Sequence, residues 1–335
     1  MKLAQEKGLC RVRVLWTHNY DPKVSGSGVF MYLAAAALKG QGVEPELLYL
    51  GNLRRPLDWM QAIRLVRNRA VDYDIIHSQF GSAAAAVTAF APDARRVVSL
   101  RGSDWTPTVG GGLARSAHAA AASTMSRASL GRYDLAVCVS QRIARSVLIS
   151  RPSTKVMVLP DPIDTALFHP VDRALARRQA DVEDHGGPLV LFTALDRKIP
   201  NKRVELALAG VNWARREVPE IELLIATGRR FDEMPAVVAS CDVALCTSID
   251  EGWPNAIKEA LACNIPFVAT DVSDLATLAA REPTCVVVPP TPEAIGRALV
   301  RAIRGGPPEN LPRLLDDMTM EAFGKALLAA YQGLL

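Results

Sequence analysis

Residues 242–271 read DVALCTSIDEGWPNAIKEALACNIPFVATD and contain one complete strand–helix–strand unit. The runs DVALCTS (242–248) and IPFVATD (265–271) are short and apolar on both faces. Such strands are typical of parallel sheets, because helices cover both faces of those sheets. Between the two runs, Gly252 permits a tight turn and Pro254 suits the first turn of a helix. This stretch therefore predicts an α/β fold.

The same alternation of strand-like and helical runs continues along most of the chain, which favours two successive α/β units. The expected strands lie at 10–16, 44–50, 74–79, 95–102, 134–140 and 155–160, and then at 188–195, 221–228, 242–248, 265–271 and 284–290. A polar, proline-bearing stretch, 161–188, separates the two groups. For 335 residues, two compact domains are expected. We place them at 1–170 and 171–315, and expect a helix at 316–335 to pack back on the first domain.

Composition is that of a soluble globular protein, with 49% hydrophobic and 22% charged residues. No run reaches the roughly 18 apolar residues of a spanning helix, and the N-terminus has no apolar segment before a cleavage site. We therefore expect a cytoplasmic protein. The six cysteines form no C-x-x-C pair and have no histidine at metal spacing. Buried, reduced thiols are expected, and no metal is predicted.

Charge is distributed unevenly. Residues 1–170 contain 21 Lys and Arg against 12 Asp and Glu, a net +9, whereas the remainder has 18 against 23, a net −5. An anionic partner for the first half, either a lipid surface or a phosphate-bearing acceptor, fits this pattern. No nucleic-acid recognition motif accompanies the charge. The stretch 54–70 is basic and amphipathic, so it suits either an anionic membrane at the inner face or an ordinary solvated helix.

Three loops of the second unit should meet at the carboxyl edge of its sheet, where parallel α/β proteins bind ligands. One of them, IDEGWPNA, leads into a helix and places Glu251 before the turn and Glu259 inside the helix. Two such carboxylates suit the paired hydroxyls of a ribose and of a sugar ring. The alternative is a loop acid and a helix acid paired with neighbours such as Lys258.

A second loop, ALDRKIPNKR, concentrates positive charge near the same edge. Arg197 and Lys202, with Lys198 and Arg203 beside them, suit a diphosphate and the charge of a departing phosphate. Alone, this run indicates a solvated loop. Beside Glu251 and Glu259 it favours a clamp.

These motifs resemble a known family, the retaining GT-B glycosyltransferases with an E-x7-E motif (group 1 type). The resemblance extends over residues 10–275 through SGSGVFMYLAAAAL, DIIHSQFG, VVSLRGSD, CVSQRIA and VLPDPIDTALFHP, in that order. The stretch PNAIKEALACNIPFVATDVSD is most similar to the branch that acts in bacterial exopolysaccharide and teichuronic acid assembly. The resemblance implies two Rossmann-like domains facing each other across a cleft. The first would bind the acceptor and the second the nucleotide-sugar donor.

The resemblance also implies roles for individual residues. Lys202 and Arg197 would bind the diphosphate and stabilise the leaving nucleotide, Glu259 would hold the ribose, and Glu251 would contact the transferred sugar. The backbone amides assigned to help Glu251 are those of Gly252, Trp253, Pro254 and Asn255. The glycine loop with Gly26 and Gly28 would approach the donor phosphates, although a plain turn explains it equally well. No cofactor or metal is implied, because lysine, arginine and amide groups replace a metal.

This sequence departs from the family pattern in two places. After the fourth strand, where many members have a histidine, it has Arg101. Either Arg101 takes over a contact with donor or acceptor, or the site accepts a different sugar. Nearby, Asp104 is a cleft residue or a helix cap, and His77 is a cleft residue or a buried structural histidine. His18 is expected near the acceptor. The loop after 221–228 is also short, so the nucleobase pocket must be built differently, with Arg229 and Arg230 at its border.

The expected activity is retaining transfer of a sugar from a nucleoside diphosphate sugar to a hydroxyl of a glycan, lipid-linked or small-molecule acceptor, in cell-surface polysaccharide or glycoconjugate biosynthesis. Two alternatives remain open: a sugar-nucleotide epimerase or phosphorylase of similar fold, and a non-catalytic binding subunit.

Overall fold

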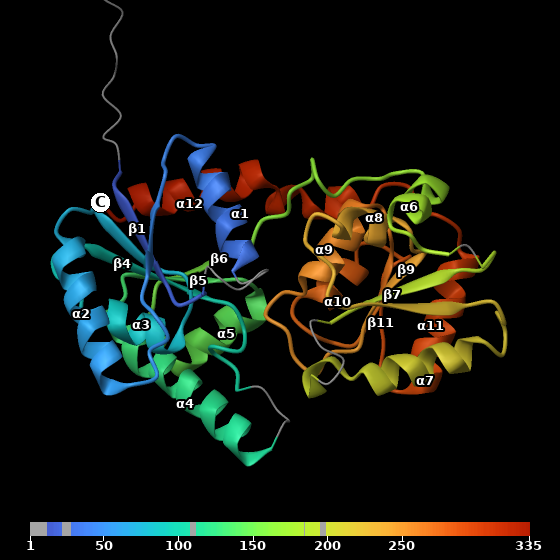
Figure 1. The fold of residues 1–335 in the computed structure, drawn as a ribbon, viewed down its shortest axis with the longest axis horizontal. Coiled ribbons are helices and arrows are strands. Elements are labelled where there is room, and N and C mark those ends of the chain that lie inside the picture. Colours follow the sequence, from blue (N-terminus) through green and yellow to red (C-terminus); the bar gives the residue numbers. More distant parts are fainter. Residues whose placement is uncertain (1–11, 22–27, 108–111, 184, 195–198) are drawn as a thin grey trace, which may run out of the picture.

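The computed structural model describes residues 12–335 apart from 22–27, 108–111, 184 and 195–198. It contains two parallel sheets, one of six strands and one of five (Figure 1). All strands predicted from the sequence form, and the fold class is confirmed. The observed strand ends differ from the predicted ones by a few residues, because hydrogen-bond pairing with the neighbouring strands, rather than composition, sets where a strand begins. The first strand, expected at 10–16, runs Val14–His18, in register with Glu46–Tyr49.

The first sheet has the order β2-β1-β3-β4-β5-β6. Its strands are β1 (Val14–His18), β2 (Glu46–Tyr49), β3 (Ile75–Ser78), β4 (Arg95–Leu100), β5 (Leu135–Cys138) and β6 (Val156–Val158). The helices packed around it are α1 (Val29–Lys39), α2 (Pro56–Ala70), α3 (Ser82–Thr88), α4 (Leu113–Ser129) and α5 (Gln141–Ser150), with a short 3-10 turn η1 (Leu130–Arg132). The strand order reverses direction at β1, as in doubly wound sheets.

The second sheet has the order β11-β10-β9-β7-β8. Its strands are β7 (Leu189–Thr193), β8 (Glu222–Ala226), β9 (Val243–Cys246), β10 (Phe267–Ala269) and β11 (Val286–Val287). Its helices are α6 (Arg173–Gln179), α7 (Val204–Ala214), α8 (Met234–Ala239), α9 (Asn255–Ala262), α10 (Leu275–Ala279) and α11 (Pro292–Arg304), with 3-10 turns η2 (Pro200–Lys202) and η3 (Pro312–Met318).

The chain returns to the first sheet through its last helix, α12 (Met320–Gln332), which lies beside α1 (Figure 1). Tyr331 of α12 is completely buried there, where its hydroxyl accepts a hydrogen bond from Trp16 Nε1 at 3.0 Å and contacts His77 Nδ1 at 2.6 Å. The segment 161–188 between the two sheets is the linker. Its buried side chains Ile163 and Phe168 belong to a hydrophobic cluster that contains residues packed on both sheets. The two sheets are therefore packed together, not merely linked.

Candidate active site

The candidate site begins where β7 and β9 end. Asn201, in the turn η2, joins the loop after β7 to the loop after β9. Its side-chain amide donates to the carbonyl of Asp250 at 2.7 Å and accepts from the amide of Asp250 at 3.2 Å. Its own carbonyl accepts from the amide of Ile249 at 2.8 Å. The cationic loop and the acidic loop are thus held side by side, as the carboxyl edge of a parallel sheet predicts.

Lys202 and Glu251 meet across this junction. The Lys202 ammonium donates to Glu251 Oε1 at 2.6 Å, and Ser248 Oγ donates to the same oxygen at 2.7 Å. The two charged side chains are 27% and 17% exposed. Burial lowers the pKa of Lys202, but Glu251 outweighs it and leaves that pKa above its ordinary value. Lys202 is therefore a charged, half-buried cation at the sheet edge.

Arg203, the residue after Lys202, has a structural role. Its guanidinium donates to the carbonyl of Ser248 at 2.7 Å and to Thr270 Oγ1 at 3.2 Å, so it holds the loop after β9 in place. Burial lowers its pKa. Of the other two cations predicted here, Arg197 and Lys198 lie outside the described residues, so their role as a diphosphate clamp stays a prediction.

Gly252 lies where the two domains touch. A Cβ built on it would be 1.8 Å from the carbonyl oxygen of Arg101, and one built on Gly102 would be 2.8 Å from the amide nitrogen of Gly252. Ser273 Oγ donates to the Gly252 carbonyl at 2.6 Å. The reason for glycine at this position is close backbone approach between loops of different domains, in addition to the turn expected from the sequence.

Replacing Gly252 by alanine should push these loops apart, because no backbone can accept a carbon 1.8 Å away. We expect kcat/KM to fall at least tenfold and stability to fall by about 1–3 kcal/mol, as for other overpacking changes. Steady-state kinetics and thermal unfolding would measure both. Gly333→Ala is the matched control, because its nearest neighbour atom would be 3.4 Å away. Equal activity in the two variants would contradict the required contact.

Helix α9 begins three residues after Gly252. Pro254 is the N-cap residue, with extended backbone, and Asn255 is the first helical residue. Proline has no N–H, so the expectation that Pro254 supplies a backbone amide is wrong; only its neighbours can donate. Trp253 is buried and its ring faces the ammonium of Lys258 at 5.5 Å.

Glu259 lies in the second turn of α9 and is half-buried. Its carboxylate accepts no hydrogen bond from the part of the chain that the structure describes, in contrast to Glu251. Burial raises its pKa to about 7, and the positive charge of Lys258 opposes that rise. This carboxylate is therefore free to accept hydrogen bonds from a ligand, and two adjacent hydroxyls are suitable donors.

Arg101 has its guanidinium engaged inside the first domain. It is 7% exposed and pairs with Asp161 at 3.0 Å. It also donates to the carbonyl and the side chain of Gln79 and lies over the Phe30 ring at 4.5 Å. Burial lowers its pKa, and Asp161 more than compensates. Contact with donor or acceptor through this guanidinium would require breaking the pair, and the predicted role is not tested.

The remaining polar candidates of the first domain are also buried. Asp104 accepts from the amides of Gly81, Arg101 and Gly102, an arrangement that organises the loop, and burial raises its pKa. His77 contacts Tyr331 and, at 2.9 Å, Ser99 Oγ, which corresponds to the buried structural alternative. Burial holds its pKa well below the ordinary value.

His18 ends β1, where its ring stacks on Tyr20 at 6.2 Å. It is 3% exposed, its Nδ1 has no hydrogen-bond partner among the described residues, and burial lowers its pKa. Gly28 is the N-cap of α1, with a left-handed φ of 71°, and a Cβ there would be 3.0 Å from the Tyr20 ring. That geometry requires glycine, whereas Gly26 lies outside the described residues.

Sequence reasoning missed three residues of this region. Asn201 and Ser248 position the Lys202–Glu251 pair, and Lys258 is completely buried in α9. The signal for Lys258 was a lysine directly after the apolar Ala256 and Ile257, in a short helix between two buried strands. Arg229 and Arg230, proposed to border the nucleobase, are exposed, and Arg230 pairs with Asp232 at 2.6 Å.

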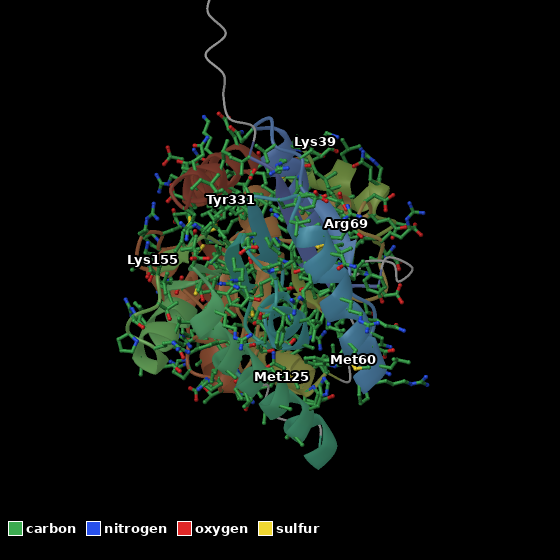
Figure 2. All side chains as sticks on the ribbon, turned by 90° about the vertical axis from the view of Figure 1, so that its left-hand side faces the viewer. Lys39, Met60, Arg69, Met125, Lys155 and Tyr331 are labelled. Carbon is green, nitrogen blue, oxygen red and sulfur yellow. The ribbon has the colours of Figure 1, made fainter. Side chains whose placement is uncertain are left out.

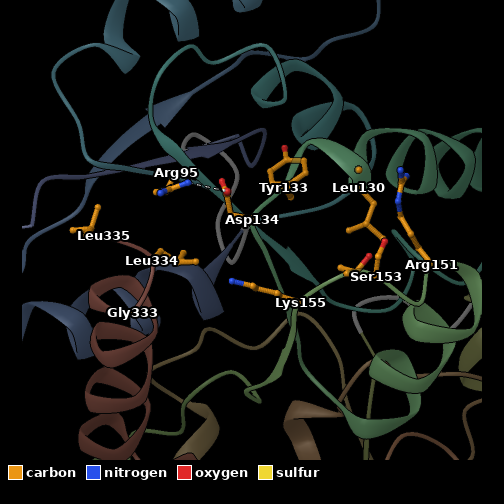
Figure 3. Close-up of a pocket in the computed structure, with 12 residues that line it drawn as sticks. Arg95, Leu130, Tyr133, Asp134, Arg151, Ser153, Lys155, Gly333, Leu334 and Leu335 are labelled. Atoms are coloured by element: carbon orange, nitrogen blue, oxygen red, sulfur yellow. Dashed lines mark ion pairs between the residues drawn. The ribbon is translucent and has the colours of Figure 1, made fainter.

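Three further findings concern metal sites, membrane spans and cavities. Within the described residues, no group of three or more His, Cys, Asp and Glu side chains could hold a metal ion, and no helix is long and apolar enough to cross a membrane. A cavity of about 560 Å³ lies at the amino ends of β4, β5 and β6, lined by Arg95 and Lys155 among others (Figure 3). It is at the opposite edge of the first sheet from the carboxyl ends, so it does not belong to this site.

Residues 181–304 match the family model described as Glycosyl transferases group 1, and residues 7–167 match that of Glycosyltransferase Family 4. Between them the two models span most of the chain. The protein is a glycosyltransferase of GT-B fold, and its two halves match these two glycosyltransferase models.

Solved structures of the same fold are similar over nearly the whole chain. Sucrose-phosphate synthase from Thermosynechococcus elongatus is 17% identical, with a TM-score of 0.76, over 96% of this chain and 99% of that one. Anabaena HepE in complex with UDP and glucose is 13% identical, with a TM-score of 0.70, over 96% and 99%. The lipopolysaccharide outer core galactosyltransferase WaaB is 12% identical, with a TM-score of 0.66, over 97% and 100%. No curated protein sequence matches the chain significantly.

Proposed function

We propose that this glycosyltransferase uses a nucleoside diphosphate sugar and transfers the sugar, with retention, to a hydroxyl of an acceptor. The observation that carries the proposal is the Lys202–Glu251–Ser248 cluster at the sheet edge, with Glu259 on the following helix, whose carboxylate accepts no hydrogen bond from a described residue. Support for the donor class comes from HepE, a protein of this fold that was solved with UDP and with UDP-glucose.

In this proposal each charged side chain of the cluster meets one part of the donor. The diphosphate replaces Glu251 as the partner of Lys202, so the cation neutralises the charge that builds up on the leaving phosphate. Glu251, released from Lys202 and still held by Ser248, accepts hydrogen bonds from the sugar. Glu259 accepts the two ribose hydroxyls. No metal is required in this scheme, since the lysine and backbone amides carry the phosphate.

The transfer itself exchanges one bond at the anomeric carbon. The bond to the phosphate oxygen breaks, its electron pair leaves with the nucleotide, and a bond forms to the acceptor oxygen on the same face of the sugar. The proton of the acceptor hydroxyl passes to the departing phosphate oxygen. Retention is proposed from the Glu251-x7-Glu259 spacing and its resemblance to retaining enzymes.

The acceptor is proposed to bind the basic first domain and to be a glycan or lipid-linked precursor of cell-surface polysaccharide or glycoconjugate. The net +9 of residues 1–170 supports an anionic, phosphate-bearing acceptor. A reaction with a panel of nucleoside diphosphate sugars, followed by anomeric analysis of the product, tests the proposal. Isomerised donor without transfer would indicate an epimerase instead, and no donor turnover at all a binding subunit.

A peripheral contact with an anionic membrane at the cytoplasmic face is part of the proposal. The outer face of α2 has a stripe formed by Leu57, Met60, Arg64 and Arg67, which the C-cap residue Val71 continues; all five are exposed (Figure 2 shows Met60 and Arg69 along this helix). Leu57 and Met60 are 57% and 59% exposed. Apolar side chains interleaved with arginines suit the interface of an anionic bilayer.

Replacing Leu57 and Met60 by glutamate should therefore lower the partition coefficient onto vesicles that contain anionic lipid at least tenfold. The two apolar side chains can then no longer be buried in the bilayer, and the new carboxylates are repelled by the anionic lipid. Co-sedimentation measures it. Leu208→Glu, an exposed apolar position of α7 in the second domain, is the control and should bind like the parent. A parent protein that stays in the supernatant would contradict the membrane contact.

A further inference from the structure

Helix α9 contains, directly before Glu259, a lysine with no exposed surface. Its neighbours Ile257, Ala260 and Leu261 are buried apolar residues, so an apolar side chain would be expected at this position too. Placing an ammonium in such surroundings is costly unless it is paired and hydrogen-bonded. What Lys258 contacts must therefore explain its presence.

Lys258 reaches out of its own domain. Its ammonium donates to the backbone carbonyl of Asp161 at 2.5 Å, and no carboxylate among the described residues forms an ion pair with it. Asp161 belongs to the segment between β6 and α6 that joins the two sheets. The carboxylate of Asp161 is engaged by Arg101, whose Nε is 3.1 Å from each of its oxygens. Buried contacts thus run from α9 through the linker to the end of β4.

The charged groups around Lys258 come from three elements. Glu259 on its own helix and Asp161 of the linker favour its charged form, whereas Arg101, after β4, disfavours it, and burial lowers its pKa to about 8. In return, Lys258 is the charge that counteracts the effect of burial on Glu259. Cys263, one turn further along α9, is buried, and Glu259 adds to the rise of its thiol pKa.

We propose that Lys258 is a positioning residue for sugar transfer: it anchors α9 to the interdomain segment through Asp161 and keeps Glu259 ionised for the ribose of the donor. This inference rests on the proposed function, because it takes Glu259 to accept the ribose hydroxyls. Packing alone does not require a lysine. A methionine has similar length, and exchanging a buried charge for an apolar residue is often neutral or stabilising.

A pH series on the variants Lys258→Met and Lys258→Arg tests the inference. Calorimetric titration with UDP, ADP and GDP in turn, from pH 6 to 9, identifies the nucleotide that binds and its pH dependence. For the parent, affinity should rise as the pH passes about 7, where Glu259 ionises. For Lys258→Met, removing one favourable charge should move that midpoint up by about one pH unit, which lowers affinity about fivefold at pH 7 and hardly at all at pH 9.

Lys258→Arg should follow the parent, and Lys155→Met, an exposed lysine before β6, should be indistinguishable from it. A loss of affinity that is the same at every pH would indicate packing only and would overturn the inference. So would a Lys258→Met variant with the parent's pH profile.

A donor-independent measurement separates this inference from the proposed function. In the parent and in Lys258→Met, the effect of Glu259→Gln on the folding equilibrium constant is measured at pH 8. If Lys258 holds Glu259 ionised, the gain from Glu259→Gln should be about fivefold larger without the lysine. Equal gains would overturn the inference, even if nucleotides bind. If the methionine variant fails to fold, Lys258→Gln replaces it in this comparison of Glu259→Gln with and without the lysine. Absence of nucleotide binding to the parent, with the coupling intact, would instead contradict the proposed function.

Discussion

Replacing Lys202 by alanine should lower kcat by about 10²–10³-fold while the fold survives. In the proposed mechanism this lysine, at the edge of the second sheet, neutralises the diphosphate of the donor. Removing one group that stabilises developing negative charge typically costs about 3–4 kcal/mol of the activation barrier. Stability should change little, because Glu251 keeps the hydrogen bond from Ser248 at 2.7 Å. Initial rates with saturating donor measure the effect.

The matched control is Lys325→Ala. Lys325 also forms an ion pair, with Glu321 on the exposed face of α12, and exposed pairs of this kind contribute little to stability. The Lys325→Ala variant should retain the parent's rate. Lys202→Arg, which keeps the charge but changes its geometry, should recover part of the loss. Turnover in Lys202→Ala equal to that of the parent would refute the role of Lys202 at the phosphate.

Replacing Glu259 by glutamine should change stability and donor affinity in opposite directions. Burial raises the pKa of Glu259 from an ordinary 4.5 to about 7 in the folded protein. The folded state therefore binds this proton more tightly than the unfolded chain does. The resulting contribution to stability is complete below about pH 4.5 and is lost as the pH rises through about 7.

At pH 8 the parent thus holds an unfavourable buried charge that the glutamine variant lacks. We expect Glu259→Gln to be more stable at pH 8, by up to about 3 kcal/mol at about 1.4 kcal/mol for each pKa unit, and equal to the parent at pH 4.5. Its nucleotide affinity should fall about 10–100-fold, because hydrogen bonds to a charged acceptor are worth more than bonds to an amide.

Denaturant unfolding at the two pH values and calorimetric titration measure these effects. Glu282→Gln is the control, since Glu282 is buried but accepts hydrogen bonds from Thr284 and Arg313. It should be no more stable than the parent. A Glu259→Gln variant that is less stable at pH 8, or that binds nucleotide as the parent does, would show that this carboxylate has partners other than a ligand.

The fold could be predicted from the sequence because its signal is local. Buried strands such as DVALCTS and IPFVATD are apolar on both faces, and a parallel sheet is the arrangement that covers both. The meeting of Lys202 and Glu251 could be predicted for the same reason, since both follow strands of one sheet and must emerge at one edge. Strand ends could not be predicted closely, because pairing with neighbours sets them.

The roles of buried polar residues could not be predicted in this way. Whether Arg101, His77 or Asp104 faces a ligand or the core depends on contacts with residues far away in the sequence, such as Asp161 for Arg101 and Tyr331 for His77. The same limit hid Lys258, whose partner is a backbone carbonyl about a hundred residues earlier, and Asn201, which bonds the backbone of another loop. Residue type gives no information on such pairings.

The most direct test of the account is a thermal-unfolding series with UDP, ADP and GDP on the parent, Lys202→Ala and Glu259→Gln. Because a ligand that binds the native state raises its melting temperature, at least one nucleoside diphosphate should raise that of the parent by several degrees at concentrations well above its Kd. The same nucleotide should raise that of either variant by much less. If no nucleotide stabilises the parent, or if both variants respond as the parent does, then Lys202 and Glu259 do not share a nucleotide-sugar site.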